Sequence, residues 1–293
     1  MSRILVPVDF SLASHKALEY ALNMMNKEVD KLMIFHVYAL PIPDTEMPVE
    51  LLSQLGDSYR EIAETHIKKL LERIQLEHGD FLDVEAKAVP GMPVEAILEE
   101  SESMDADLIV MGMRGKNKAL RKILGTTATR VIQNTQSPVV VVPESASYSP
   151  VKRIAYASNL EEEDILALDQ VINLANGLGA QVHCVHIQRE GEQLDAYKKS
   201  ILEEAYQHDL VNSPISVDVV TNDDIVAGLN AYVEYKEIDL IVMLTHHRSI
   251  FNRIIAGSRT WEMAFQSKVP VWVFQADSKK LKRPAKKAGA KVK

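Results

Sequence analysis

The chain of 293 residues contains a single cysteine, Cys184. One thiol cannot form an intramolecular disulfide, and we expect it to lie in the core of a protein from a reducing compartment. No apolar run approaches the roughly 18 residues that a membrane-spanning helix needs. The first residues, MSRILVPVDF, lack the pattern of a signal peptide. These absences predict a cytoplasmic protein without a membrane span.

Signatures of several enzyme and metal-protein classes are also missing. The sequence has no GxxxxGK[ST] loop, which excludes the P-loop NTPases, and no GxSxG or HExxH motif. His246 and His247 are adjacent, and His183 and His186 lie three residues apart on an expected strand, so the members of each pair point to opposite sides. Zinc binding through some of these histidines is the alternative to ordinary core or surface positions. We expect no metal site and no catalytic residues.

Positive charge is scarce outside the last part of the chain. The formal net charge is −8, yet residues 279–293, KKLKRPAKKAGAKVK, hold seven Lys, one Arg and no acid. Without those eight charges the net charge of the remainder falls from −8 to −16. A body of this charge makes nucleic acid an unfavourable partner. Residues 277–293 are predicted to form a disordered basic tail.

The chain is predicted to contain two copies of one unit. RILVPVDF at residues 3–10 is matched by RIAYASNL at 153–160, an offset of 150. DLIVM occurs both at 107–111 and at 239–243, an offset of 132. The difference between the offsets, 150 − 132, means that the second copy has lost 18 residues between its second and third strands.

Each copy ends in a short apolar strand, SPVVVV at 137–142 and KVPVWVF at 268–274. Proteins cover exposed apolar strand edges. We therefore predict that domains 1–144 and 150–276 pack through these strands as an internal pseudo-dimer, with a Ser- and Pro-rich linker between them. A further homodimer and a protein partner stay open.

Within the first copy, apolar strands alternate with amphipathic helices. Apolar runs at 4–8, 32–38, 108–111 and 139–142, and an alternating run at 82–88, predict five strands. Ser11 stands where a helix N-cap belongs, and the last of four expected helices runs from about Thr126 to Asn134. Each copy is therefore predicted to be an α/β domain with a doubly wound, five-stranded parallel sheet flanked by helices. Such sheets bind ligands beyond the C-terminal ends of their strands, where the strand order reverses.

The segment after the fourth strand, MGMRGKNKALRKILGTTATR at residues 111–130, has the chemistry of an anion-binding loop. Gly112 and Gly115 lack a Cβ, so that backbone N–H groups can turn sharply and approach an anion. Gly125 precedes a helix whose first turn carries two threonine hydroxyls and unsatisfied N–H groups. The segment is therefore suited to hold phosphate groups.

Two further residues fit a nucleotide at this edge of the sheet. Arg114 can make bidentate hydrogen bonds to phosphate. Asp9, which follows the first strand, can accept hydrogen bonds from ribose hydroxyls. On spacing alone, a nucleotide site and a simple loop with turn glycines and a capped helix stay equally open.

These motifs resemble the universal stress protein family. The pattern Gly-x2-Gly-x9-Gly-Ser/Thr is complete at positions 112, 115, 125 and 126, and ILVPVDFS, GMP and DLIVMG accompany it. The resemblance covers residues 1–276 and implies a tandem member whose first domain binds ATP, with Mg²⁺ as a further candidate. It implies an adenine read by the main chain near the end of the second strand. The nucleotide-binding positions that it implies are Pro7, Val8, Asp9, Val37, Met111, Gly112, Arg114, Gly115, Gly125, Thr126 and Thr127.

The second copy has lost most of this pattern. The aligned replacements are Leu244 for Gly112, His247 for Gly115 and Asn159 for Asp9, and only Gly257 and Ser258 remain. A leucine adds a bulky side chain where the backbone would have to approach phosphate. We therefore predict one nucleotide site per chain, in the first copy.

Three functions fit these observations. The first is a nucleotide-binding stress-response regulator, the second a slow ATPase or autophosphorylating enzyme, and the third a nucleotide-free interaction scaffold. Asp9 is the only acid in the two loops, so that no general base is evident and weak ATP hydrolysis is the most that we expect. The proline-rich loop at residues 39–48 is expected to flank the nucleotide.

Overall fold

The computed structural model describes most of both predicted copies. The described residues are 2–25, 30–40, 49–79, 83–113, 126–160, 162–191, 194, 198, 200, 215–245, 267 and 269–275. Some predictions concern residues outside these ranges, namely Arg114, Gly115, Gly125, His246, His247, Gly257, Ser258, most of the proline-rich loop and the basic tail.

In the described part of the first copy, five strands alternate with four helices. They are β1 (Arg3–Pro7), α1 (Leu12–Met24), β2 (Lys31–Tyr38), α2 (Val49–His78), β3 (Asp83–Pro90), α3 (Pro93–Ser103), β4 (Leu108–Met113), α4 (Thr126–Asn134) and β5 (Val139–Pro143). Ser11 is the N-cap of α1, since its side chain accepts a hydrogen bond from the backbone N–H of Ser14. The predicted strands, the predicted cap and the extent of the last helix are thus confirmed.

The second copy repeats this order with one shortened connection. Its described elements are β6 (Arg153–Ala157), α5 (Glu162–Leu178), β7 (Gln181–Gln188), β8 (Ile215–Thr221), α7 (Ile225–Tyr235), β9 (Leu240–Thr245) and β10 (Val271–Gln275). Between β2 and β3 the chain has 44 residues, from 39 to 82, whereas between β7 and β8 it has 26, from 189 to 214. The 18 missing residues (44 − 26) therefore fall where the first copy has the long helix α2.

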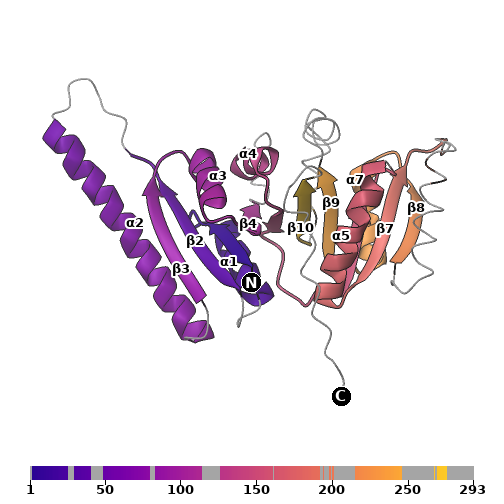
Figure 1. The fold of residues 1–293 in the computed structure, drawn as a ribbon, viewed down its shortest axis with the longest axis horizontal. Helices are drawn as coiled ribbons and strands as arrows, with labels where there is room; N and C mark the ends of the chain where they lie inside the picture. Colours follow the sequence, from indigo (N-terminus) through magenta and orange to yellow (C-terminus); the bar gives the residue numbers. More distant parts are fainter. Residues whose placement is uncertain are drawn as a thin grey trace, which may run out of the picture.

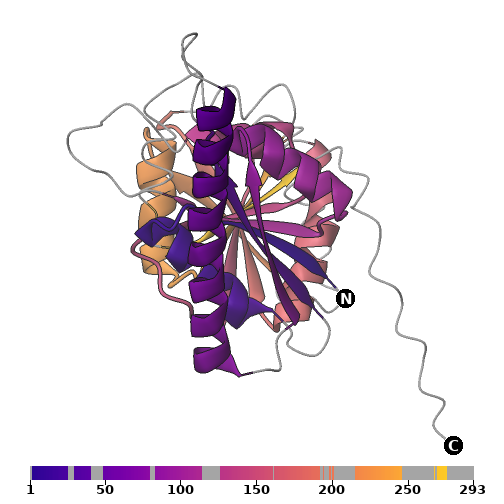
Figure 2. The same cartoon turned by 90° about the vertical axis from the view of Figure 1, so that its left-hand side faces the viewer.

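All ten strands form one sheet, in the order β3-β2-β1-β4-β5-β10-β9-β6-β7-β8. Within each copy the strands are parallel, and the copies join through β5 and β10, which pair antiparallel with Val141 opposite Val271. The predicted packing through the two terminal strands is confirmed. Figure 1 shows β10 near the middle of the molecule, and the view along the sheet shows the strands fanned out by their twist (Figure 2).

Helices cover both faces of the sheet. On one face, α3, α4 and α7 pack on a core that runs without interruption through both copies. On the other face, α1 and α2 cover the first copy and α5 covers the second, and Trp272 of β10 packs against both of these cores. The long helix α2 lies along the outer strand β3, at the left of Figure 1.

The central strands are buried on both faces, as their uninterrupted apolar runs predict. In β5, Val139 and Val141 face the shared core, whereas Val140 and Val142 face the core beneath α1 and α2. Each of these four valines is at most 1% exposed. Helices on both sides of such strands exclude water from the middle of the sheet. None of the helices in the part of the chain that the structure describes is long and apolar enough to cross a membrane.

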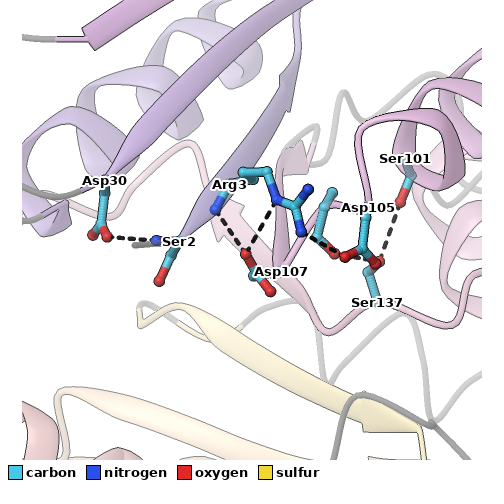
Figure 3. Close-up of polar contacts among 8 residues, drawn as sticks. Ser2, Arg3, Asp30, Ser101, Asp105, Asp107 and Ser137 are labelled. Atoms are coloured by element: carbon cyan, nitrogen blue, oxygen red, sulfur yellow. Dashed lines mark hydrogen bonds and ion pairs between the residues drawn. The ribbon is translucent and has the colours of Figure 1, made fainter. Parts of the chain in front are cut away.

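Hydrogen bonds and ion pairs join β1 to β4 at the N-terminal edge of the sheet (Figure 3). The backbone N–H of Arg3 donates to the carboxylate of Asp107 at 2.9 Å, and the N–H of Asp107 donates back to the carbonyl of Arg3 at 2.8 Å. The guanidinium of Arg3 pairs with Asp105, and Ser137 donates to the carbonyl of Ala106 at 2.8 Å. This edge is therefore occupied by structural contacts.

The second copy repeats the same arrangement. The carboxylate of Asp239 accepts from the N–H of Arg153 at 2.9 Å, and the guanidinium of Arg153 pairs with Glu237 at 2.6 Å. Asp105 and Glu237 both have left-handed backbones, with φ of 48° and 51°. The two copies therefore share the left-handed backbone at this position, although the residue is Asp105 in the first copy and Glu237 in the second.

Candidate functional site

The candidate site lies at the C-terminal edge of the first copy, between β1 and β4. These strands are neighbours in the sheet, with Ile4 opposite Leu108. From β1 the chain continues outward to β2 and β3, and it then returns to β4 and β5 on the other side. This reversal of strand order makes the ends of β1 and β4 the topological switch point of the sheet, which is where α/β proteins bind ligands.

The loop after β1 is held at its start and exposed at its tip. Val8 is buried, and its N–H donates to the carbonyl of Phe35 at 2.8 Å. Asp9 is exposed, and its carboxylate accepts hydrogen bonds from the backbone N–H and the hydroxyl of Ser11. Phe10 has a left-handed backbone with φ of 60°. The loop therefore presents a carboxylate to solvent from a fixed turn.

The structure brings six of the predicted site residues to this edge. Pro7 pairs with Phe35, so that Val37 lies two residues further along β2, level with the loop that carries Asp9. Met111 and Gly112 are near the end of β4 and pair with Val141 and Val142 of β5. The six residues that meet here are Pro7, Val8, Asp9, Val37, Met111 and Gly112.

Gly112 has a structural reason for lacking a side chain, in addition to the one that its motif suggests. A Cβ at this position would lie 2.2 Å from the carbonyl oxygen of Ala13 and 2.7 Å from the backbone nitrogen of Ser14. Real Cβ atoms do not approach backbone so closely, so the first turn of α1 can pack on β4 only because residue 112 is glycine. The missing side chain makes room for the helix, and a role of the Gly112 backbone in binding phosphate stays a prediction.

Helix α4 begins with Thr126 and Thr127, as predicted. The chain leaves β4 at the C-terminal edge of the sheet and enters β5 at the opposite edge, so the N-terminus of α4 is the end nearer to the candidate site. Arg130 of α4 pairs with Glu95 of α3 at 2.9 Å, which joins the two helices on this face. Arg114, Gly115 and Gly125 connect β4 to α4 and lie outside the described residues.

A histidine on α1 shares its surroundings with the exposed carboxylate. Burial lowers the pKa of His15, and the nearby charge of Arg73 lowers it further, whereas Asp9 acts in the opposite direction. A guanidinium nitrogen of Arg73 lies 3.4 Å from Nδ1 of His15. The neutral imidazole is thus favoured beside Asp9, with Nδ1 in reach of a donor from α2.

Sequence reasoning missed an aromatic cluster beside the loop. The ring of Phe10 lies 4.6 Å from that of His36 on β2 and 5.1 Å from that of His66 on α2. A signal for its central histidine was present, because His36 and His186 are 150 residues apart, which is the offset of the repeat in this region.

His183 and His186 occupy separate positions in the second copy. His183 is hydrogen-bonded to Ser216 at 2.7 Å, and His186 to the carbonyl of Ser158 at 2.9 Å. Their neighbours Val185 and Cys184 belong to the cores on opposite faces of the sheet, which agrees with the predicted alternation. In the described ranges no three His, Cys, Asp or Glu side chains are placed to share a metal ion.

Leucines fill the corresponding edge of the second copy. Leu244 stands where the first copy has Gly112, and it is 8% exposed within the core beneath α5. Leu160 stands where the first copy has Phe10; it is 2% exposed, and its φ is 58°. The turn is thus retained, while the side chains around it point into the protein.

A buried carboxylate also distinguishes the second copy from the first at this edge. Asp164 of α5 accepts hydrogen bonds from the hydroxyl of Tyr156 at 2.8 Å, the hydroxyl of Ser158 at 3.0 Å and the N–H of Asn159 at 2.9 Å. Asp164 occupies the position of Ser14 in the first copy. The loop after β6 therefore has an internal anion as its partner, which the loop after β1 lacks at this position.

The model of the universal stress protein family matches residues 1–143 and 150–275. Universal stress protein MJ0531 of Methanocaldococcus jannaschii is 34% identical over 145 residues, which cover 48% of this chain and 81% of that protein. A crystal structure of a universal stress protein from Archaeoglobus fulgidus has 21% identity and a TM-score of 0.68, covering 93% of this chain and 96% of that one. The two structures therefore share the tandem fold.

A family protein from Arabidopsis thaliana, crystallised with AMP bound, is also similar over part of the chain. It has 17% identity and a TM-score of 0.34, covering 49% of this chain and 92% of that one. A TM-score this low does not place a ligand in this chain.

Proposed function

The chain belongs to the universal stress protein family, and from that premise we propose that its first copy binds one adenine nucleotide, with ATP as the first candidate. The observation that carries the proposal is the meeting of Asp9 and Val37 with the end of β4, where the glycine motif begins, at the switch point between β1 and β4. The glycine motif joins this edge to the N-terminus of α4.

Each part of this edge suits one part of a nucleotide. The exposed carboxylate of Asp9 can accept hydrogen bonds from ribose hydroxyls. The main chain near Val37, at the end of β2, can bond to the adenine. The N–H groups and hydroxyls that open α4 favour the negative charge of phosphates. Arg114 and Gly115 would supply the remaining phosphate contacts.

The corresponding edge of the second copy is filled, which supports a single nucleotide site in the first copy. Leu244 and Leu160 fill its strand ends, and the carboxylate of Asp164 binds the N–H of Asn159. A buried carboxylate at this place repels phosphate. Because it already accepts the N–H of the loop, the loop needs no ligand to satisfy that group. We therefore assign no nucleotide to the second copy.

We propose binding, rather than turnover, as the role of the site in a stress-response regulator. The carboxylate of Asp9 is hydrogen-bonded to Ser11, and its proposed partner is the ribose, which leaves it unsuited to activate water. The occupancy of the site would then follow the ATP concentration and report the energy state of the cell.

The test is calorimetric titration of the purified chain with ATP, with and without Mg²⁺, after mass spectrometry of the denatured protein for bound nucleotide. We expect about one ATP per chain. AMP and cAMP show whether the β- and γ-phosphates are needed, and GTP tests whether the base is read. If no adenine nucleotide binds, the proposed function is wrong. If ADP is released at a steady rate, the regulator is also a slow ATPase.

A further inference from the structure

The carbonyl of Val8 is bound by a histidine side chain. Nδ1 of His36, on β2, lies 2.8 Å from this oxygen. A carbonyl oxygen only accepts hydrogen bonds, so Nδ1 carries the proton and donates it. The N–H of Val8 also donates to the carbonyl of Phe35 on the same strand. The residue before Asp9 is thus held at both of its backbone groups by β2.

The residue after Asp9 is held by the same histidine. Phe10 has φ of 60°, in the left-handed region that a residue with a bulky side chain adopts only when its surroundings stabilise it. Its ring packs at 4.6 Å from that of His36 and at 5.1 Å from that of His66. His36 therefore contacts the loop on both sides of Asp9, through a hydrogen bond to Val8 and a ring contact with Phe10.

The same turn is present in the second copy, where the glycine motif is lost. Nδ1 of His186 lies 2.9 Å from the carbonyl of Ser158, and the N–H of Ser158 donates to Val185 at 3.0 Å. Leu160 has φ of 58°, close to that of Phe10. The histidine thus stabilises the turn itself in both copies. The copies differ in the side chains on the turn, which are Asp9 and Phe10 in the first and Asn159 and Leu160 in the second.

From this geometry we infer that His36 is a positioning residue for the nucleotide site, which acts on the ligand through the Val8–Phe10 turn that carries Asp9. The inference rests on the proposed function, because it needs a nucleotide in the first copy. A small shift of the carboxylate weakens its hydrogen bonds to ribose, while the core of the sheet stays in place.

Three variants test this role. His36→Leu removes the donor, His36→Asn keeps an N–H donor near the place of Nδ1, and His186→Leu removes the matching bond in the second copy. We expect ATP affinity to fall about tenfold in His36→Leu, in line with the loss of one hydrogen bond that holds the site. His36→Asn should restore most of the affinity, and His186→Leu should bind ATP like the wild type. Thermal melting should show a similar loss of stability in both leucine variants.

A fourth variant keeps the test decisive if His36→Leu does not fold. Leu160 shows that this turn accepts leucine, so Phe10→Leu should keep the fold while removing the ring contact with His36. We expect ATP affinity to fall about threefold, the lower end of the range for an aromatic pair.

The outcomes separate this inference from the function on which it rests. If wild-type protein binds ATP and His36→Leu binds it equally well, the positioning role is wrong. Equal losses of affinity in His36→Asn and His36→Leu would also overturn it, as would a loss in His186→Leu as large as that in His36→Leu. Absence of ATP binding by the wild type would overturn the proposed function and this inference together.

Discussion

Gly112 of β4 touches the first turn of α1 at Ala13 so closely that a methyl group cannot fit between them. The carbonyl oxygen of Ala13 lies 2.2 Å from the place of the missing Cβ. This contact is between backbone atoms, so no side-chain rotation can relieve it. In the second copy Leu244 stands at the equivalent position, and its side chain is buried in the core beneath α5.

The first prediction follows from this contact. Gly112→Ala should lower the free energy of unfolding by about 1–3 kcal/mol, because α1 must move away from β4 to admit the methyl group. Gly177→Ala, in α5, is the control: a Cβ there meets nothing within 4 Å, and alanine favours helix by up to about 1 kcal/mol. Denaturant unfolding measures both, and a Gly112→Ala variant as stable as wild type would contradict the close packing of α1 on β4.

The second prediction compares the motif with its lost counterpart. Gly115→Val should abolish ATP binding, since the β-branched side chain would occupy the approach of the phosphate and restrict the loop. His247→Val, the equivalent change in the second copy, should leave the stoichiometry at about one ATP per chain. Calorimetric titration distinguishes the cases. Two sites of similar affinity in wild type would refute the assignment of a single site.

The third prediction concerns the junction of the copies. Val141 is fully buried in the shared core and lies opposite Val271 of the other copy. Val141→Ala should cost about 2 kcal/mol, from two buried methyl groups and the cavity that they leave. Because the core is continuous, differential scanning calorimetry should show one unfolding transition in wild type, and hydrogen exchange should speed up in both copies of the variant. Two separate transitions in wild type would argue that the copies unfold independently.

The fourth prediction is a pH dependence from His183. Burial lowers the pKa of this histidine below its usual value of 6.5; Lys236 and Arg153 lower it further, and Asp218 opposes them. The folded state therefore binds the proton less readily than the unfolded state, so that stability falls as the pH drops through and below 6.5. His183→Asn should flatten the dependence of unfolding free energy on pH between about 7 and 5.

A companion variant separates titration from hydrogen bonding at this place. Ser216→Ala removes the partner of Nδ1 but keeps the titrating group. It should shift the stability curve and retain the wild-type slope. If His183→Asn retains that slope as well, the histidine is not its source.

Local patterns predicted the elements well because each pattern depends on residues close in sequence. The helix from Thr126 to Asn134 and the N-cap at Ser11 are found where the sequence places them. The pairing of β5 with β10 could be predicted because each is an apolar strand whose edge would otherwise be exposed to solvent. The fusion of both sheets into one of ten strands, with a shared core on one face, depends on strand direction at the junction, which no local pattern encodes.

The candidate site was predicted less completely, since its particular contacts join distant parts of the chain. The close contact of Gly112 with Ala13, 99 residues earlier, was not predicted. The bond from His36 to Val8 and the acceptance of three donors by Asp164 depend on how the loops fold back on the sheet. Comparison of the two copies by offset would have singled out both histidines, because the repeat conserves their position.

Because the thiol of Cys184 is buried, the native protein should react only very slowly with maleimides and similar reagents. It is 4% exposed, and burial raises its pKa to about 12, so that almost no reactive thiolate is present at neutral pH. As it is the only cysteine in the sequence, its rate of alkylation measures how often the core beneath α5 opens. Because Cys184 reacts so slowly, a cysteine introduced at exposed Asn23 or Leu76 can be labelled with a fluorescent dye without labelling Cys184 as well.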